Sequence, residues 1–453
     1  MKKKLFLSLA AVLLMLVQLI LLLPVGAFAD ETTALTEQEL PVSAYRPPEI
    51  EQAKSALVYN FENDMMLFEH NITERLYPTS TAKLMTAIVA YEKLKDNLGD
   101  SITITKAMMD EVVGNNVGLM EGEIVTAEQM LSVLLVNSAN DAAIVLAYAA
   151  YGSVEAFVAQ MNEKAAWLGA YDTYYANPTG MHNDAMVTTA KDTAIIAKYA
   201  YSIPLIVELT STPKYVMEGT NMSDYRNIYN RNCLISKYYN TNYYYERALG
   251  LNAGSTTQGG YCIAAVAEDP ASGLTYLVVV MGAEGEDATV YSYINAIELF
   301  DWAFEAYGYT EVLSANKFIC ELDVELSSTL DYVTLVPERS ISVYLPTDVD
   351  PATDIRISYN TFEDSLDAPV EKGQTAGTIT VLHGEDILGS CALVTTSDIA
   401  RSEFLYFLAR VRVFVQGRFF IATMVSFVVL SVLYVFIKAS YKEKKMRSRS
   451  MRH

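Results

Sequence analysis

Cysteine and histidine are scarce in this chain, with four of each among 453 residues. The cysteines, Cys233, Cys262, Cys320 and Cys391, do not have the spacing of a zinc site, and no histidine lies near any of them. They are also too few for a disulfide scaffold, although a Cys320–Cys391 bridge and free buried thiols both remain open. The sequence therefore predicts no metal site and no cofactor.

Positive charge is also in short supply. The chain has 33 lysines and arginines against 54 aspartates and glutamates, which gives a formal net charge of −21. An anionic surface repels the phosphate backbone, so the composition argues against nucleic-acid binding. The simplest interpretation of the negative charge is solubility outside the cell.

Long apolar runs mark both ends of the chain. Residues 1–29 contain three lysines, an apolar run and Ala27-Phe28-Ala29, the pattern of a secretory signal peptide, with an uncleaved anchor as the alternative. Residues 419–437 carry no charge and are close to the roughly 20 residues that a membrane-spanning helix needs. The basic tail at 438–453 is typical of a cytoplasmic end. We expect a single-pass protein of the cell membrane whose bulk is extracytoplasmic.

The remaining residues divide by composition and by strand and helix pattern into two domains, which follow a polar, proline-containing linker at 30–49. Residues 50–308 begin and end with strand hairpins and have apolar helices between them, which predicts an α+β domain whose first and last strands share one antiparallel sheet. Residues 309–400 alternate in short strands and predict a small all-β domain. Residues 401–418 mix arginines with aromatic residues, as in a helix that lies at a lipid surface.

Ser80 and Lys83 are the first candidate catalytic residues. The apolar spacing of residues 82–95 predicts a buried helix that begins here. Side chains three residues apart lie on one face of a helix, so the amine of Lys83 can reach the hydroxyl of Ser80 as a base reaches a nucleophile. Ser211 and Lys214 have the same spacing, but the proline between them breaks helical geometry.

A second candidate group lies at residues 137–141, where Asn-Ser-Ala-Asn-Asp separates two apolar helices. Polar groups between buried helices must be hydrogen-bonded or used for binding. Ser138 and Asn140 are therefore candidates for the same site as Ser80.

These stretches together resemble the D-alanyl-D-alanine carboxypeptidases, the low-molecular-mass penicillin-binding proteins of the serine peptidase family that shares the β-lactamase/transpeptidase fold. That family has the signatures S-x-x-K, S-x-N and K-T-G in chain order. Residues 78–86 look like the first and residues 136–143 like the second. Weaker matches at 177–182 and 368–374 extend the likeness across both domains. The resemblance implies a β-lactamase/transpeptidase-like catalytic domain, a small all-β domain and a C-terminal transmembrane helix.

The resemblance also implies a mechanism and a substrate. Ser80 would attack the penultimate D-alanine of a peptidoglycan stem peptide and form an acyl-enzyme, and β-lactam antibiotics would acylate the same hydroxyl. Lys83 would have to be neutral to accept the Ser80 proton. Ser138 would relay the proton, and Asn140 would bind the substrate amide.

The third signature departs from the family. Residues 250–256 occupy the G-x-K-T-G-x-T position, with Asn252 and Ala253 in place of lysine and threonine, followed by Gly254 and Ser255. These four residues would line the substrate strand, but without the charge and the hydroxyl that hold the substrate carboxylate. Two lost contacts of about 1.5 to 3 kcal/mol each correspond to about 10²- to 10⁴-fold in rate. Arg231 and Arg247 are candidates to replace the charge.

Two functions follow from these motifs. The first is a membrane-anchored serine D-Ala-D-Ala carboxypeptidase whose activity depends on residues 252 and 253. The alternative is a catalytically impaired relative that binds the cell wall or acts as a scaffold.

Overall fold

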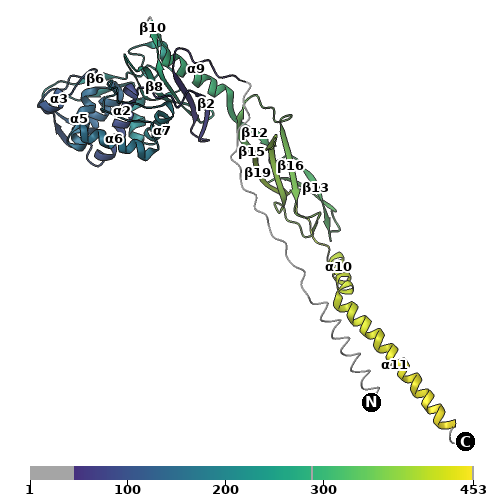
Figure 1. Ribbon diagram of the computed structural model, residues 1–453. Coiled ribbons are helices and arrows are strands. Elements are labelled where there is room, and N and C mark those ends of the chain that lie inside the picture. Colours follow the sequence, from purple (N-terminus) through teal and green to yellow (C-terminus); the bar gives the residue numbers. More distant parts are fainter. Residues whose placement is uncertain (1–44, 287–288, 451–453) are drawn as a thin grey trace. The chain divides into compact units, whose positions relative to one another are not determined.

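The structure is a computed structural model that describes residues 45–286 and 289–450 (Figure 1). The expected signal peptide and most of the expected linker lie outside the described residues. The chain divides into two compact units, one built mainly from residues up to Thr310 and the other mainly from Glu311 onward. Each unit is described by itself.

The first unit is organised on a five-stranded sheet of order β2-β1-β9-β8-β7, in which each neighbouring pair is antiparallel. The first strands of the unit therefore pair with its last ones, as the sequence predicts. Strand β7 lies at the edge, so one side of its backbone is open. The strands are β1 (Ser55–Asn60), β2 (Met65–His70), β7 (Ala248–Thr256), β8 (Gly260–Asp269) and β9 (Leu274–Ala283).

Helices cover both faces of this sheet. Strand β9 is buried along its whole length, and its side chains alternate between the two faces. Tyr276 contacts Phe304 of α9 (Tyr291–Ala306), whereas Met281 accepts a hydrogen bond from Thr193 of α7 (Ala190–Tyr201). Because these two β9 residues have opposite parity, α9 and α7 lie on opposite faces (Figure 1).

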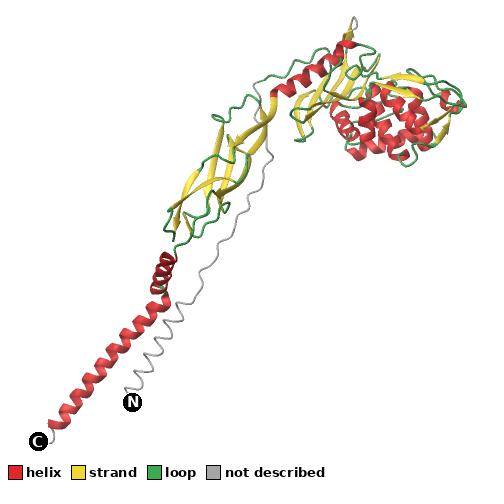
Figure 2. Cartoon of the chain, turned by 180° about the vertical axis from the view of Figure 1, so that it is seen from behind, coloured by secondary structure: helices red, strands yellow, loops and turns green. Residues whose placement is uncertain are grey.

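The α7 side of the sheet holds most of the helices, which form a cluster beside the strands (Figure 2). Helix α2 is at its centre, since its first nine residues are all buried. Threonine and serine N-caps begin several of the others and satisfy free backbone N–H groups there. The helices and short helical turns are η1 (Thr79–Thr81), α2 (Ala82–Leu94), α3 (Lys106–Asp110), α4 (Ala127–Asn137), α5 (Asn140–Tyr151), α6 (Val154–Leu168), α8 (Pro204–Ser211) and η2 (Thr241–Tyr243).

Three two-stranded ribbons complete the first unit. They are β3 (Ser101–Thr103) with β4 (Ile124–Thr126), β5 (Lys214–Met217) with β6 (Arg226–Tyr229), and β10 (Gly285–Glu286) with β11 (Thr289–Val290).

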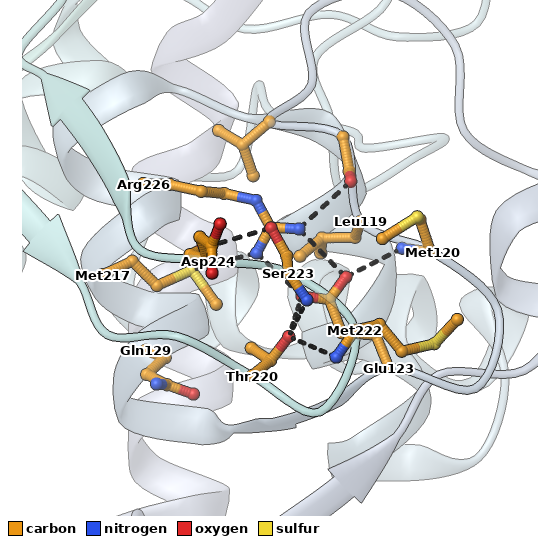
Figure 3. A network of polar contacts seen from close by, with 12 residues as sticks. Leu119, Met120, Glu123, Gln129, Met217, Thr220, Met222, Ser223, Asp224 and Arg226 are labelled. Carbon is orange, nitrogen blue, oxygen red and sulfur yellow. Dashed lines mark hydrogen bonds and ion pairs between the residues drawn. The ribbon is translucent and has the colours of Figure 1, made fainter.

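A buried ion pair fastens the β5–β6 hairpin to the body of the unit (Figure 3). Glu123 is fully buried and receives hydrogen bonds from both terminal nitrogens of Arg226, at 2.7 and 3.1 Å. The hydroxyl of Thr220, in the hairpin loop, donates to the same carboxylate at 2.8 Å. Burial raises the pKa of Glu123, but the hydrogen bonds from Arg226 and Thr220 outweigh it and leave that pKa below its ordinary value. The carboxylate is therefore charged and fully partnered.

The second unit is all-β up to residue 400, as predicted. Its six-stranded sheet has the order β16-β18-β19-β14-β13-β17. The strands from residue 307 onward are β12 (Tyr307–Leu313), β13 (Cys320–Glu325), β14 (Tyr332–Pro337), β15 (Ile341–Pro346), β16 (Ile355–Thr361), β17 (Ser365–Asp367), β18 (Thr375–His383) and β19 (Asp386–Thr395).

Two helices follow the β domain. Helix α10 (Glu403–Gln416) covers most of the expected juxtamembrane segment and has no buried residue. Helix α11 (Arg418–Ser450) contains Arg418–Lys442, which is long and apolar enough to cross a membrane. Helices α5 and α6 are long and apolar enough to cross a membrane only if they are taken together, and they are bent by 87° relative to each other. They belong to the core of the first unit.

The predicted fold class is confirmed: a mixed helix and sheet domain is followed by an all-β domain and an apolar C-terminal helix. The alternatives for the cysteines are also decided. All four are free thiols, so Cys320 and Cys391 form no bridge; Cys233 and Cys262 are buried, whereas Cys320 and Cys391 are partly exposed.

Candidate active site

Ser80 lies in a short helical turn that leads directly into α2. The turn, η1, spans Thr79–Thr81, and α2 begins at Ala82. Ser80 therefore precedes the α-helix instead of belonging to it, which differs from the geometry assumed from the spacing. Ser80 and Lys83 nevertheless line one cleft of about 350 Å³.

Lys83 is buried below Ser80. Lys83 is only 2% exposed. Its Nζ donates to Ser80 Oγ at 3.5 Å and to the carbonyl of Thr179 at 2.5 Å. Burial, and secondly the charge of Arg231, lower the pKa of Lys83 to about 7. An amine with such a pKa is substantially neutral near pH 7 and can accept a proton from the serine.

The carbonyl of Thr179 belongs to a tight turn that the sequence did not identify as part of the site. Asn177 Oδ1 accepts hydrogen bonds from the backbone N–H groups of Thr179 and Gly180, at 3.1 and 2.8 Å. A Cβ at Gly180 would lie 1.9 Å from the carbonyl oxygen of Thr79, so only glycine lets this turn pack against the serine turn. The Asn-Pro-Thr-Gly stretch was part of the family likeness, but nothing in it indicated contact with a lysine 96 residues away.

Ser138 and Asn140 reach the cleft from the break between α4 and α5. Ser138 ends α4 in a left-handed conformation, with φ of 57°. Asn140 begins α5 and donates from Nδ2 to the carbonyl of Val113 at 2.6 Å. Ser138 Oγ and Asn140 Oδ1 are buried and have no hydrogen-bond partner among the described residues. Both residues line the cleft, and these two atoms have no partner there within the described part of the chain.

Asn115, a residue that sequence reasoning missed, supports this break. Its Nδ2 donates to the carbonyls of Asn137 and Ser138, at 2.8 and 3.1 Å, and its own carbonyl accepts from the Asn140 N–H at 2.7 Å. The only available signal was its place in the loop Gly114-Asn115-Asn116. That loop lies more than 20 residues before the motif it holds.

Strand β7 forms the facing side of the cleft. A Cβ at Gly254 would lie 2.4 Å from Ser80 Oγ, so the strand can pass the nucleophile only because this residue is glycine. Thr79 Oγ1 donates to the Gly254 carbonyl at 3.3 Å and holds the two segments together. Ala253 and Ser255 also line the cleft.

Asn252 is placed differently from its neighbours. It is 3% exposed, and its Oδ1 has no hydrogen-bond partner among the described residues. Side chains alternate along a strand, so Asn252 lies on the same face of β7 as Gly254, but it does not line the cleft. Strand β7 therefore offers the cleft neither a cation at 252 nor a hydroxyl at 253.

The two arginines considered as replacements are well separated in the structure. Arg231 lines the cleft, with its guanidinium 5.2 Å from the centre of the Tyr239 ring. Arg247 lies 3.6 Å from Asp269 and stacks over Phe304, and it is not among the residues that line the cleft.

The arrangement suits covalent acyl transfer. It contains a hydroxyl, a neutralisable amine in contact with it, and further polar atoms on a second segment. No cluster of three or more histidine, cysteine, aspartate or glutamate side chains able to hold a metal occurs among the described residues.

Comparison with known families gives two matches. Residues 42–285 match the family described as D-alanyl-D-alanine carboxypeptidase, and residues 307–401 match the family described as penicillin-binding protein 5, C-terminal domain.

Individual relatives cover most of the chain. It is 28% identical over 363 residues to D-alanyl-D-alanine carboxypeptidase DacF of Bacillus subtilis, covering 79% of this chain and 89% of the relative. It is 24% identical to D-alanyl-D-alanine carboxypeptidase DacA of Escherichia coli (strain K12), covering 79% and 86%. Among solved structures, penicillin-binding protein 5 of Haemophilus influenzae has a similar fold, with a TM-score of 0.56, 23% identity, and coverage of 79% of this chain and 99% of that one.

Proposed function

The chain belongs to the D-alanyl-D-alanine carboxypeptidase family of serine peptidases, and we propose that its cleft removes the terminal D-alanine from peptidoglycan stem peptides through an acyl-enzyme on Ser80. The observation that carries this proposal is the contact between Lys83 Nζ and Ser80 Oγ, at 3.5 Å, with the amine buried. Burial is what makes an ordinary lysine able to act as a base at neutral pH.

Acylation joins Ser80 to the substrate and releases the terminal D-alanine. Ser80 Oγ attacks the carbonyl carbon of the penultimate D-alanine while Lys83 Nζ takes the hydroxyl proton. The backbone N–H of Ser80 donates to the developing oxyanion. The C–N bond then breaks, and the proton passes through Ser138 to the amine of the departing D-alanine.

Deacylation returns the site to its first state. Water attacks the ester carbonyl and gives one proton to Lys83. The C–O bond to Ser80 breaks, and the proton returns to the serine oxygen. The shortened peptide leaves with a new carboxyl group, which releases the second proton of the water to solvent and becomes a carboxylate.

The edge position of β7 supports binding of an extended peptide. Among the described residues β7 has a neighbouring strand on one side only, so a stem peptide could pair with its other edge as an added strand. Asn140 then lies across the cleft for the substrate amide. β-Lactams, which present an acylating carbonyl, are expected to react with the same Ser80 hydroxyl.

We place the catalytic unit outside the cell membrane, anchored by α11. Its apolar segment Arg418–Lys442 is followed by further basic residues, which favours a cytoplasmic tail. The apolar start of the sequence supports export by the predicted signal peptide.

The experiment uses the full chain in detergent. Incubation with fluorescent penicillin should label the chain, and a peptide ending in D-Ala-D-Ala should release D-alanine. The Ser80→Ala variant should do neither. Absence of both signals from the parent chain would overturn the proposed activity.

A second function is favoured by one observation, the uncharged pair Asn252 and Ala253 on the strand that faces Ser80. If penicillin labels Ser80 and no D-alanine is released, the chain acts as a wall-peptide binding or scaffold protein. The alternative would therefore be recognised by acylation without turnover.

A further inference from the structure

A second hollow, here named the turn pocket, lies at the turn between β7 and β8 and has a volume of about 530 Å³. It is lined by Lys54, residues 255–261 and residues 282–285. Ser255, Thr256 and Tyr261 line both the turn pocket and the cleft that contains Ser80. The two hollows therefore adjoin each other at the end of β7.

Close packing holds the turn pocket beside the segment that carries Ser80. A Cβ at Gly259 would lie 2.4 Å from Cγ2 of Thr79, and a Cβ at Gly285 would lie 2.4 Å from the ring of Tyr261. Only glycine permits these two approaches, so backbone instead of bulky side chains forms this part of the wall. The backbone therefore sets the position of the turn pocket next to the nucleophile.

Two opposite charges line the turn pocket. Lys54 and Glu284 are the only charged residues among its described lining, and both are exposed. The stem of Lys54 lies along Gly282, where an added Cβ would be 3.0 Å from Lys54 Cδ. Neither charged residue forms an ion pair with the other or with any other described residue. Because the two charges do not neutralise each other, they suit a ligand that itself carries both.

The sheet fixes the backbone at both charges. Lys54 directly precedes β1, and its N–H donates to the carbonyl of Met281 at 3.1 Å. Glu284 directly follows β9, and its N–H donates to the carbonyl of Gln52 at 2.7 Å. The two charges therefore stand at the same end of the antiparallel β1–β9 pair.

The strand side of the cleft is asymmetric about the nucleophile. Strand β7 passes Ser80 Oγ at Gly254, and the strand residues that line the cleft run from Ala253 to Thr256. One lining residue therefore lies on one side of Gly254, whereas two lie on the other side and lead to the turn pocket. Under the proposed function only one substrate residue, the terminal D-alanine, lies beyond the bond that is cleaved. The short side fits that residue, and the longer side fits the chain that precedes it.

We propose that the turn pocket binds the side chain of the residue that immediately precedes D-Ala-D-Ala, and that this side chain ends in both an ammonium and a carboxylate. Glu284 holds the ammonium, and Lys54 holds the carboxylate. A strand advances about 3.3 Å per residue, so a long side chain one residue before the penultimate D-alanine reaches the turn pocket from β7. The proposal rests on the proposed function, because it names the class of stem peptide that the site selects: one with a diamino dicarboxylic acid at this position.

The test measures binding without turnover, in the full chain with Ser80→Ala and in detergent. Calorimetric titration compares three peptides that end in D-Ala-D-Ala and differ only in the residue before it. That residue is diaminopimelate, with both groups, lysine, with the ammonium alone, or 2-aminopimelate, with the carboxylate alone. The diaminopimelate peptide should bind about fivefold more tightly than either of the others, as expected for one strong ion pair between exposed groups.

Each charge is tested by its own variant, added to Ser80→Ala. Lys54→Met keeps the apolar stem and should remove the advantage over the lysine peptide, while the advantage over the 2-aminopimelate peptide remains. Glu284→Gln should do the reverse. Lys191→Met and Glu121→Gln change exposed residues outside both hollows and should keep both advantages. Thermal unfolding of each variant checks that the fold is retained.

Three results would overturn the proposal: equal affinity for the three peptides, advantages that survive both variants, and binding of none of the peptides to the Ser80→Ala chain. Turnover by the parent chain is a separate measurement. If the parent releases D-alanine and the Ser80→Ala chain shows no preference, the proposed activity stands and the turn-pocket assignment falls. If the preference is present and the parent releases no D-alanine, the assignment stands and the proposed activity falls.

Discussion

The two sides of the cleft differ in completeness. The helical side brings together a hydroxyl, a buried amine and two polar atoms that have no hydrogen-bond partner among the described residues. It is formed by Ser80, Lys83, Ser138 and Asn140. The strand side, residues 252–255 of β7, offers backbone and close packing but no cation. The difference separates chemistry from recognition. Under the proposed function, the groups that would make and break bonds lie on the helical side, while the strand side carries no charge that could bind a substrate carboxylate.

The largest effect should come from breaking the helical side. Ser80→Ala should lower acylation by fluorescent penicillin at least about 10³-fold, because it removes the hydroxyl that Lys83 contacts and would activate. The measurement is fluorescence of the labelled band after electrophoresis.

A matched control is available in the chain. Ser211→Ala changes the serine of the second Ser-x-x-Lys spacing, which ends α8 before a strand instead of opening a helix. Labelling should be unchanged there. Strong residual labelling of Ser80→Ala would show that the helical side is not the reactive one.

The next effect concerns the ion pair that holds the β5–β6 hairpin. Glu123→Ala leaves the largely buried Arg226 without its partner and should lower the free energy of unfolding by about 3 kcal/mol. Urea denaturation measures this change. The exposed Glu121→Ala is the control and should stay within about 0.5 kcal/mol of the parent. Equal stability of the two variants would mean that the ion pair does not hold the β5–β6 hairpin.

Repairing the strand side should give a smaller change. Asn252→Lys with Ala253→Thr should raise kcat/KM about 10-fold, through the hydroxyl contact added at residue 253, which lines the cleft. D-Alanine release is the measurement. No gain in D-alanine release would contradict the view that the side chains missing from this strand limit turnover.

The smallest effect is the pH dependence of the helical side. Burial first, and the Arg231 charge second, lower the pKa of Lys83 to about 7. Only the neutral amine accepts a proton, so acylation should rise with pH through about 7, by about tenfold between pH 6 and pH 8. Arg231→Gln removes a neighbouring positive charge, so the pKa of Lys83 should rise and the midpoint should move to higher pH. A pH-independent rate of penicillin labelling would contradict the assignment of Lys83 as the base.

Local parts of this site were accessible from the sequence. Ser80 and Lys83 are only three residues apart, so local backbone geometry brings them into contact. The polar residues around Ser138 and Asn140 are visible in the sequence because they interrupt an apolar pattern. The pairing of the first strands with the last also followed from hairpins at both ends of the domain. Such features depend on periodicity and short spacing, which a sequence displays directly.

The rest of the site depends on contacts between distant segments. The Thr179 carbonyl reaches Lys83 across 96 residues, and no local pattern predicts that approach. Arg231 and Arg247 were equivalent in the sequence, and only tertiary packing puts one in the cleft and the other near Asp269. The spacing also predicts the short turn that holds Ser80 as the first turn of α2, because apolar spacing alone does not determine the residue at which a helix begins.

The close approach at Gly254 has a consequence for how such a chain could lose its activity. The space between this residue and Ser80 Oγ is too small for one methyl group. A single-base change from glycine to alanine would block the nucleophile while leaving every catalytic side chain in the sequence. Inspection of the signature serines and lysine would then misjudge the gene product as active. When a copy of this gene is suspected of encoding an inactive protein, the codon for residue 254 should therefore be examined first.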